Sequence, residues 1–581
     1  MIGRIEAYIR RLRRHLSRSE WLARLLRLPV STGTETSPGL VLIQIDGLSQ
    51  PEFEKALQRG ELPFLDRLIR REHYCVHRFY SGVPATTAAV QGELFYGVKG
   101  AVPGFNFKEH DTGRLVRMYE TAAAARVERR LEADGGEPLL TGGSCYAVNF
   151  TGGAAEPHFC PTAYGWGPAL REASPLVVIL LILSNTYSFL RTFVLLLLEM
   201  VLAVVDFMRG LIDGQDVIKE LIFVPTRVAI TILLRELSTI GVKIDVARGL
   251  PTVHVNFLGY DEQAHRRGPS SDFAHWTLKG IDDAIARIWR AAHRSSRRHY
   301  DVWIYSDHGQ EQTQSYEKLH GREFSTAVAE VFSRYEGSPI QLRSSGSLGV
   351  GLQRVSYVGG GRFQKLFPVN IWHAGDIEGP HLSIAPMGPI ARIYDDAEPG
   401  TGADSVLARA LVDEAKVPLV LVKGKPGYAR AWTSEGEFVL PDDKVRILGA
   451  DHPFLDEATQ DLLAMCHHPD AGEFIASGWR AGHDALSFAI ENGAHGGFGP
   501  LETNGFALVP GDIELQGKTR DYARPVDLRN AALQLLGRSE RKPAPTIERP
   551  AAGQGTLRIM TYNVHSCIGM DGKLAPERIA R

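Results

Sequence analysis

Cysteine is scarce in this sequence, and no two cysteines form a recognisable pair. The 581 residues contain five, and no CxxC motif joins any of them. An odd number of widely spaced cysteines argues against a disulfide framework and a thiolate zinc site, and it favours a reducing compartment. The five are Cys75, Cys145, Cys160, Cys466 and Cys567.

The sequence also lacks a long uninterrupted apolar run and a marked net charge. No stretch matches the ~20 consecutive apolar residues of a simple membrane-spanning helix. Arginines interrupt every apolar stretch before Pro29, which is unlike a secretory signal. The 65 basic and 67 acidic residues leave a net charge of −2. Because such a chain has no global field to hold nucleic acid, we predict no nucleic-acid binding.

Charge is nevertheless uneven at the beginning of the chain. Eight arginines lie within the first 30 residues, against Glu6 and Glu20. Residues 1–29 have the spacing of a basic amphipathic helix, so we treat 1–38 as a separate N-terminal segment. Two interpretations stay open: the helix packs on its own protein, or anionic lipid headgroups attract it.

Three apolar runs end in polar residues, which is typical of buried parallel strands. They are LVLIQIDG (40–47), VHVNFLGYDEQAH (253–265) and DVWIYSDHGQ (301–310). Between the last two, residues 273–293 are amphipathic with helical spacing. The strand–helix–strand order predicts an α/β fold, with a mostly parallel sheet between helices and a site at the carboxyl edge of its strands. We assign residues 39–537 to this domain.

Residues 175–240 have a different character and form a predicted apolar helical insertion. Two helices, about 189–210 and 217–240, each carry one narrow polar stripe on an apolar surface. The polar stripes could pack against each other or against the catalytic domain, which would leave the apolar faces outward. We therefore predict contact with a membrane, and a buried dimer or domain interface is the alternative. The stripes consist of Ser188, Arg191, Thr192, Glu199, Asp206 and Arg209, and of Glu220, Arg227, Thr231 and Ser238.

Carboxylates and imidazoles gather at the predicted strand ends. Divalent cations such as Zn²⁺ bind such groups, and a site for two ions needs roughly six of them. One aspartate alone is more often structural than a ligand, but the ordered set Asp, Thr, DxxxH, DHG, HGG is much rarer by chance. The ligand candidates are Asp46, Asp261, His265, Asp307, His308 and His495.

A hydroxyl nucleophile is expected at a helix start, where backbone amides and the helix dipole favour anions. The stretch GVPATTAAVQGELFYG (82–97) offers Thr86 and Thr87 after a predicted strand, HYCVHRFYS. One of the two can be an N-cap, and we assign that part to Thr86.

Together these motifs resemble the alkaline phosphatase superfamily, and within it the type I phosphodiesterase/nucleotide pyrophosphatase branch. The match covers roughly residues 40–110, 250–310 and 485–510. In that branch the nucleophilic Thr precedes a helix-closing Gly by ten residues, and Gly97 therefore indicates Thr87.

The resemblance implies a metal-dependent phosphodiesterase with two divalent ions, Zn²⁺ by ligand type, with Mn²⁺ compatible. Asp261, His265 and His495 would hold one ion. Asp46, Asp307 and His308 would hold the other, with Thr87 on it as an alkoxide that forms a covalent phospho-threonine intermediate.

Two departures from the branch leave the choice between diester and monoester open. The Pro that often follows the nucleophile is Ala88, and the clamping amide has no clear equivalent; Lys108 stands at its distance and Asn106 two residues earlier. We take Asn106 and Lys108 as substrate-binding candidates. A phosphomonoesterase is the alternative activity, and a membrane-bound scaffold with a degenerate site is the alternative class.

The C-terminal residues carry a second, much shorter resemblance. After a Pro/Ala/Gly-rich linker at 538–555, residues 556–581 include LRIMTYNVH, which is similar to the opening strand of the endonuclease/exonuclease/phosphatase family. Asn563 is the residue that would belong to that family's site. We interpret this as the start of a second enzyme in a fusion, or as a gene product truncated at the join.

The site and the insertion together suggest where the enzyme acts. The predicted substrate is a phosphoester. An apolar insertion between the nucleophile and the second metal motif would bring a membrane near the site, so a lipid-linked phosphoester is one candidate substrate. Unpaired cysteines and N-terminal arginines predict the cytoplasmic side of a membrane.

Overall fold

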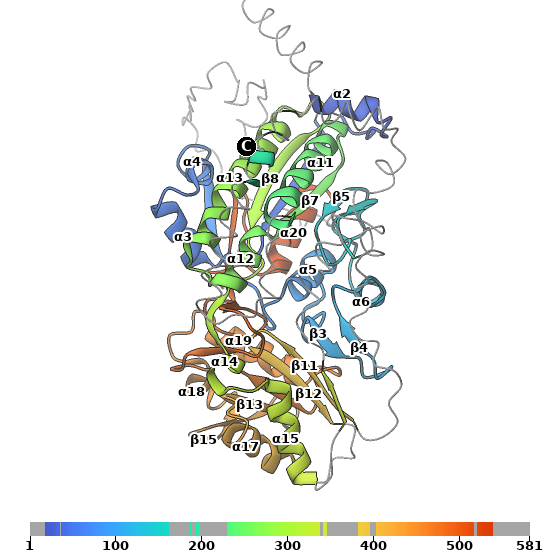
Figure 1. The fold of residues 1–581 in the computed structure, drawn as a ribbon. Coiled ribbons are helices and arrows are strands. Elements are labelled where there is room, and N and C mark those ends of the chain that lie inside the picture. The colour runs from blue at the N-terminus through green and yellow to red at the C-terminus, as the bar shows by residue number, and fades with distance from the viewer. Residues whose placement is uncertain are drawn as a thin grey trace, which may run out of the picture.

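The computed structural model describes residues 18–34, 36–161, 229–336, 341–344, 381–395, 403–515 and 520–538, and isolated positions between 183 and 197. These residues form two seven-stranded sheets, one in the upper and one in the lower half of Figure 1. The predicted segments 1–17 and 539–581 lie outside the described residues, as does most of the predicted insertion.

The first sheet is mostly parallel. Its strand order is β2-β19-β8-β1-β7-β5-β6, and β8, β1, β7, β5 and β6 are mutually parallel. Only β19 runs against both of its neighbours. The strands are β1 (Pro38–Ile45), β2 (Tyr74–Tyr80), β5 (Ser144–Tyr146), β6 (Glu156–His158), β7 (Thr252–Phe257), β8 (His299–Tyr305) and β19 (Asn504–Pro510).

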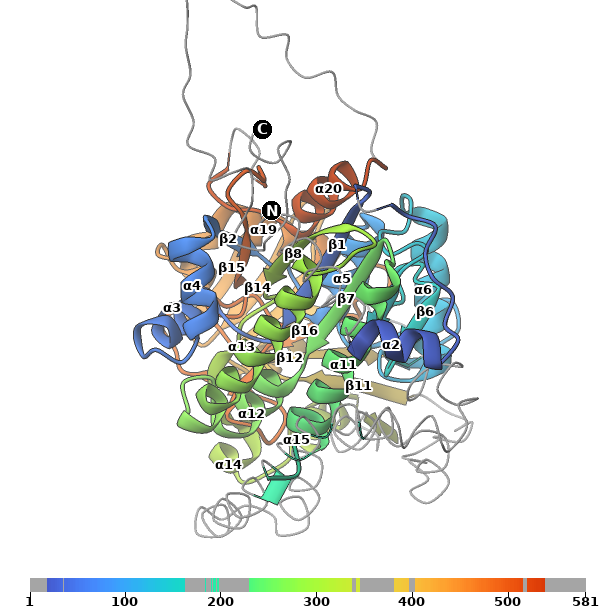
Figure 2. The same ribbon diagram turned by 90° about the horizontal axis from the view of Figure 1, so that it is seen from above.

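Helices cover both faces of this sheet, as the view from above in Figure 2 shows. Alternate side chains of β1 enter the two cores: Val41 and Ile43 pack with α3, α4, α11, α12 and α13, and Leu40 and Leu42 with α5, α6 and α20. The helices are α3 (Gln50–Gln58), α4 (Pro63–Arg71), α5 (Thr87–Tyr96), α6 (Thr121–Asp134), α11 (Arg235–Arg248), α12 (Gly259–Arg267), α13 (Asp272–His293) and α20 (Pro525–Leu535).

The second sheet is almost wholly antiparallel and has its own two cores. Helices α15 and α17 lie over one core, and α18 and α19 over the other. Its strands are β10 (Gln341–Ser344), β11 (His381–Met387), β12 (Ile390–Asp395), β16 (Phe474–Ser477), β13 (Leu419–Lys423), β14 (Ala429–Thr433) and β15 (Gly436–Leu440). Its helices are α14 (Tyr316–His320), α15 (Phe324–Glu336), α17 (Ala403–Asp413), α18 (Lys444–Leu448) and α19 (Leu455–Cys466).

Two small sheets complete the described strands. One consists of β17 (Ala485–Ser487), β9 (Glu311–Ser315) and β18 (Gly493–Ala494), and the other of β3 (Asn106–Lys108) and β4 (Leu115–Arg117). In the first of these sheets, β9 follows the DHG motif and β18 precedes His495. Because β9 and β18 pair, the sheet brings the two motifs together.

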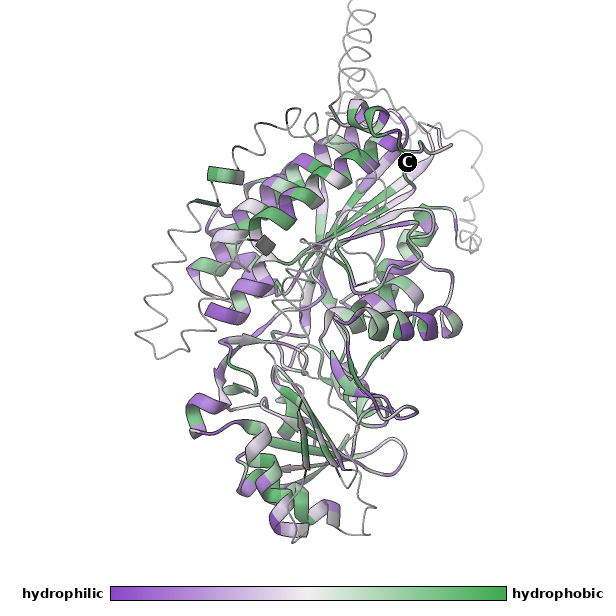
Figure 3. Cartoon of the chain, turned by 45° about the vertical axis from the view of Figure 1, so that its right-hand side comes forward, coloured by the Kyte–Doolittle hydropathy of each residue, from purple (hydrophilic) through white to green (hydrophobic). Residues whose placement is uncertain are grey.

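The α/β class is confirmed, with a mostly parallel sheet between helices. The predicted helix 273–293 is α13, at Asp272–His293, and all three predicted strands form neighbouring parallel strands of one sheet. Figure 3 shows apolar residues along these strands and on the helix sides toward them. The second sheet was not anticipated.

The prediction of outward apolar faces was wrong for the end of the insertion. After a π-helical turn at Ala229–Leu234, α11 lies between α2 and α13 against β7, and its apolar and polar residues are both buried, Val242 and Ser238 among them. This helix is apolar on most sides because other elements cover it on most sides. Within the described residues, no helix is long and apolar enough to cross a membrane.

The N-terminal segment packs on the protein where it is described. Helix α2 (Arg18–Leu25) buries Leu22 and Ala23 against Ile240 and Ile244 of α11. The interpretation that this segment packs on its own protein therefore holds for residues 18–25. The four described cysteines carry free thiols, as their spacing predicts.

A buried ionic cluster ties α11 to the far edge of the first sheet. Arg248 is 1% exposed, and its guanidinium donates to both oxygens of Glu156, at 2.5 and 2.8 Å, and to Asp245 at 2.9 Å. Asp245 also accepts hydrogen bonds from Ser144 and Tyr146 of β5.

We expect Arg248→Met to lower the free energy of unfolding by about 3 kcal/mol, because it leaves the buried Asp245 and the partly buried Glu156 without their cation. Urea denaturation of the full chain measures the change. Arg409→Met is the matched control: Arg409 pairs with Asp413 in the open, and its loss should cost about 0–1 kcal/mol. Equal losses in the two variants would contradict the assignment.

Candidate active site

The predicted site residues converge at the carboxyl edge of the first sheet. Asp46 follows β1, Asp307 and His308 follow β8, and Asp261 lies in the first turn of α12, directly after β7. His495 follows β18, which pairs with β9. Parallel strands end at one edge, so residues distant in sequence meet there.

Thr87 is the first residue of α5, and Thr86 is its N-cap. The Thr86 hydroxyl accepts a hydrogen bond from the backbone N–H of Ala89 at 3.3 Å, as the sequence predicts. Gly97 ends the helix in a left-handed conformation, at the position that the spacing argument used. Thr87 therefore sits where the positive end of the helix dipole favours an anion.

One group of ligand atoms surrounds the Thr87 hydroxyl. Its Oγ1 lies 3.2 Å from His308 Nε2 and 3.5 Å from Asp46 Oδ1. His308 Nε2 lies 3.3 Å from Asp307 Oδ2 and 3.5 Å from Asp46 Oδ1. Ligand atoms of Asp46, Asp307 and His308 all lie within 4.8 Å of one another, which suits a common cation.

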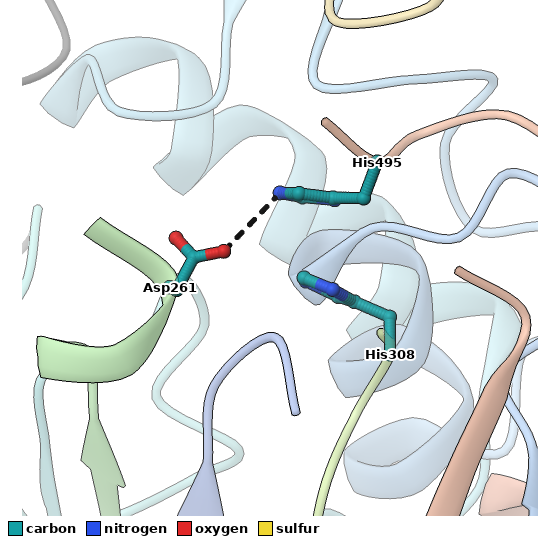
Figure 4. A group of neighbouring side chains, drawn as sticks. All are labelled: Asp261, His308 and His495. Atoms are coloured by element: carbon teal, nitrogen blue, oxygen red, sulfur yellow. Dashed lines mark ion pairs between the residues drawn. The ribbon is translucent and has the colours of Figure 1, made fainter. Parts of the chain in front are cut away.

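A second group adjoins the first. Ligand atoms of Asp261, His308 and His495 also lie within 4.8 Å of one another. Figure 4 shows the three side chains next to one another. His495 Nε2 is 3.6 Å from Asp261 Oδ1, and the His308 and His495 rings stack with centroids 3.7 Å apart. His265 Nε2 lies 3.4 Å from Asp261 Oδ1 but belongs to neither group. His308 is thus common to both groups.

Hydrogen bonds of the three histidines leave one nitrogen of each ring available for a cation. Each Nδ1 lies within hydrogen-bond distance of a backbone carbonyl oxygen. The distances are 3.0 Å from His265 to Gly493 O, 3.0 Å from His308 to Gly309 O, and 2.9 Å from His495 to Ala85 O. A carbonyl only accepts, so Nδ1 carries the hydrogen and the Nε2 lone pair faces the carboxylates. This is the usual arrangement of metal-binding histidines.

The carboxylates are buried deeply. Asp46, Asp261 and Asp307 are at most 1% exposed. Burial, together with the charge of the nearby Asp261, raises the pKa of Asp307 to about 7, although a hydrogen bond from Thr87 acts in the opposite direction. Burial and the neighbouring His308 lower the pKa of His495 well below its usual value. Three carboxylates packed together this tightly need positive charge, and these residues therefore fit divalent cations.

The glycine of the IDG motif permits this crowding. Gly47 has φ +74°, and a Cβ there would stand 2.7 Å from Asp261 Oδ1. Its backbone N–H also donates to Asp307 Oδ1 at 3.4 Å. Only glycine adopts this conformation at low cost and leaves space for the aspartate.

Sequence reasoning missed the residues that orient the ligands. Asn256 Nδ2 donates to Asp46 Oδ2 at 2.7 Å, and Gln310 Nε2 donates to Asp261 Oδ1 at 2.7 Å. Both lie at ends of the predicted strands (VNF and DHGQ), so polar residues at those ends were an available signal.

Two buried glutamates support the loop that carries His495. Glu502 accepts hydrogen bonds from Gly497 N and Gly499 N at 2.8 and 2.7 Å, and Glu311 accepts one from Leu501 N at 2.7 Å. Burial raises the pKa of Glu502 to about 8 and that of Glu311 to about 7. Nothing in the sequence pattern pointed to either residue.

The two substrate-binding candidates lie on β3, which contacts β11 of the second sheet. Lys108 Nζ is 6.0 Å from the ring centroid of Tyr394 in the second sheet, and Asn106 Nδ2 is 3.8 Å from Met387 Sδ. Neither lines the pocket beside Thr87. Their substrate-binding roles stay predictions.

Comparisons with known proteins bear on the segment that holds four of the ligand candidates. Residues 249–346 match the family model described as type I phosphodiesterase / nucleotide pyrophosphatase. No curated protein sequence matches this chain significantly.

Two solved structures of similar coverage are phosphonoacetate hydrolase from Sinorhizobium meliloti 1021 and human ectonucleotide pyrophosphatase / phosphodiesterase 5. The first is 13% identical with a TM-score of 0.42, covering 87% of this chain and 97% of that one. The second is 12% identical with a TM-score of 0.41, covering 86% and 95%.

The matched segment contains β7, α12, α13 and β8, and with them Asp261, His265, Asp307 and His308. Through this segment the chain is similar to the type I phosphodiesterase / nucleotide pyrophosphatase family.

Proposed function

We propose that the chain hydrolyses a phosphodiester, with Thr87 as nucleophile at a site that holds two divalent cations. The observation that carries the proposal is the position of the Thr87 hydroxyl at the start of α5, 3.2 Å from His308 and 3.5 Å from Asp46. Mixed carboxylate and imidazole ligands favour Zn²⁺, with Mn²⁺ compatible.

In the proposed reaction, Thr87 attacks phosphorus and the residues around it orient the phosphoryl group. Divalent cations held here would lower the pKa of the Thr87 hydroxyl and neutralise charge on the phosphoryl group. Thr87 Oγ1 forms a bond to phosphorus, the alcohol leaves, and water then releases the phosphoester from Thr87. The amide groups at the start of α5 face the developing negative charge. A phosphomonoesterase would use the same residues, so it is the alternative activity.

Metal content tests the two-ion site. We expect metal-reconstituted wild-type protein to bind two ions per chain, and Asp307→Ala or His265→Ala to bind about one fewer and to lose turnover, because each removes a ligand. Atomic absorption after gel filtration gives the stoichiometry. Two ions in both variants with full turnover would refute these ligands. Wild-type protein without metal would favour a non-catalytic scaffold.

Substitution of the two neighbouring threonines tests the nucleophile. Thr87→Ala should abolish turnover of bis(p-nitrophenyl) phosphate and keep both metals, whereas Thr86→Ala should keep most of the activity and lose about 0.5–2 kcal/mol of stability with the cap. Thr87→Ser should keep part of the turnover.

The same assay with p-nitrophenyl phosphate separates diester from monoester activity, and we expect the diester to be the better substrate. An active Thr87→Ala protein beside an inactive Thr86→Ala protein would transfer the assignment to Thr86.

We also propose that the insertion holds the enzyme on the cytoplasmic side of a membrane and that the substrate is lipid-linked. Between positions 183 and 197, five large apolar side chains are 48–62% exposed, whereas Thr192 is 4% exposed. The spacings of three, four and seven residues among the five place them on one side of a helix. Such an outward apolar face supports contact with lipid rather than water. The exposed residues are Leu183, Leu190, Phe193, Val194 and Leu197.

Replacement of these five residues by Gln should move the protein from the membrane fraction to the supernatant, because it removes the apolar face. The wild-type protein should resist a high-salt wash and need detergent for release. A matched variant with Gln at five exposed sites elsewhere (Trp21, Val30, Leu319, Val406 and Val445) should stay with membranes. If the wild-type protein instead stays in the supernatant as a dimer without detergent, the apolar face is an interface between two copies of the chain and the membrane proposal fails.

A further inference from the structure

A pocket larger than the one beside Thr87 lies between α5 and α19. Its volume is about 270 Å³, whereas a protein cavity of ~150 Å³ is enough to bind benzene. Neither Thr87 nor any candidate metal ligand lines it, and it shares no lining residue with the pocket beside Thr87. The pocket therefore has room for a small organic molecule outside the candidate active site.

Most of the pocket wall is apolar. Val83 and Pro84 come from the loop before α5, Val102 and Pro103 from the loop after it, and Met465 from α19. Val83, Val102 and Met465 are at most 6% exposed, so the surrounding structure fixes them in place. Apolar walls with a few well-placed polar groups are typical of small-molecule sites, where they contact the carbon skeleton of the ligand.

Asp461 of α19 supplies a carboxylate to this wall. The Tyr80 hydroxyl and Arg524 Nη1 donate to its Oδ2 at 3.1 and 3.0 Å. Its Oδ1 accepts no hydrogen bond from the described residues, and the Lys99 ammonium lies 2.5 Å from it as an ion-pair partner. Since buried carboxylate oxygens normally accept hydrogen bonds, Oδ1 has an unfilled place for a donor.

Lys99 is an occupant that a ligand can displace. Its side chain is 50% exposed, whereas that of Asp461 is 2% exposed. A lysine that turns out into solvent regains rotamer freedom, and ion pairs with such a half-exposed partner contribute little to stability. The Lys99 ammonium covers Oδ1 in this structure, so its departure opens that oxygen to the pocket.

The charged residues of the wall, together with their ion-pair partners, favour a cation. Arg524 pairs with Glu93 at 3.1 Å and with Asp461 at 3.0 Å. Glu457 lies 2.8 Å from Arg524 and 3.8 Å from Lys99. Three carboxylates therefore share two cations, which leaves an excess of negative charge. A ligand cation lowers the repulsion among these carboxylates.

His468, which also lines the pocket, adds no positive charge. Its Nδ1 accepts a hydrogen bond from the backbone N–H of Asp470 at 3.0 Å and so carries no hydrogen. Burial lowers the pKa of His468 to about 4, although the charge of Asp470 acts in the opposite direction. At neutral pH a cationic ligand therefore meets an uncharged imidazole.

We propose that this pocket binds a small primary amine, whose ammonium group takes the place of the Lys99 ammonium at Asp461. The apolar skeleton of the amine packs against Val102 and Met465. An ammonium group has three donors, so it can supply the hydrogen bond that Oδ1 lacks. The ligand class is a primary ammonium ion on an uncharged skeleton of about one ring.

Three molecules with the same benzyl skeleton test the site. Benzylamine is a cation at neutral pH, benzyl alcohol is uncharged, and phenylacetate is an anion, so the three differ in the charge of the head group. Calorimetric titration of the full chain gives each Kd. Because the titration needs no turnover, its result does not depend on the proposed function.

We expect Lys99→Ala protein to bind benzylamine about tenfold more tightly than benzyl alcohol, the value of one hydrogen bond to a charged group, and phenylacetate more weakly than either. Wild-type protein should bind benzylamine more weakly than Lys99→Ala protein does, because Lys99 competes for Asp461. Lys444→Ala is the matched control: Lys444 pairs with Asp456 of the same helix outside the pocket, and this variant should bind benzylamine as wild-type protein does.

A second substitution locates the bound amine. Ala464 is exposed and lines the pocket, so Ala464→Trp fills the space without disturbing a buried position. Added to Lys99→Ala, it should abolish benzylamine binding. Binding that survives Ala464→Trp would place the amine elsewhere and overturn the proposal. Equal affinity for benzylamine and benzyl alcohol, a preference for phenylacetate, or no gain in affinity from Lys99→Ala would also overturn it.

Discussion

Electrostatic repulsion among Asp46, Asp261 and Asp307 is the constraint on which the rest of the site depends. All three are at most 1% exposed, and added positive charge lowers their mutual repulsion. The three imidazoles lie with Nδ1 at backbone carbonyls, so each Nε2 can serve as a cation ligand. The Thr87 hydroxyl lies beside this group, 3.2 Å from His308 Nε2.

The part of the site that depends on short spacings could be predicted from the sequence. Asp307 and His308 are adjacent, and Asp261 and His265 are one helical turn apart, so their proximity follows from strand and helix geometry. The distribution of ligands could not be predicted, since His308 lies between two groups that the sequence keeps apart. That depends on how the small sheet that contains β18 is placed relative to the end of β8, not on any local pattern.

Other features escaped prediction for equally physical reasons. The apolar character of α11 suggested an outward face, but a helix covered by α2, α13 and β7 has the same composition. The second sheet is antiparallel with weakly patterned strands, which give little signal along the chain.

The anchoring of the nucleophile helix has a consequence for biosynthesis. Arg524, before α20, donates to Glu93 of α5 at 3.1 Å and to Asp461 and Glu457 of α19 at 3.0 and 2.8 Å, and it is 3% exposed. Arg524 and Glu93 are 431 positions apart. At translation rates of ~5–20 residues per second, the helix that carries Thr87 waits roughly 20–90 s for this partner to be synthesised. Helix α5 therefore gains this anchor only after Arg524 is synthesised, and a ribosome-bound fragment that ends before Arg524 displays the Thr87 motif without the anchor.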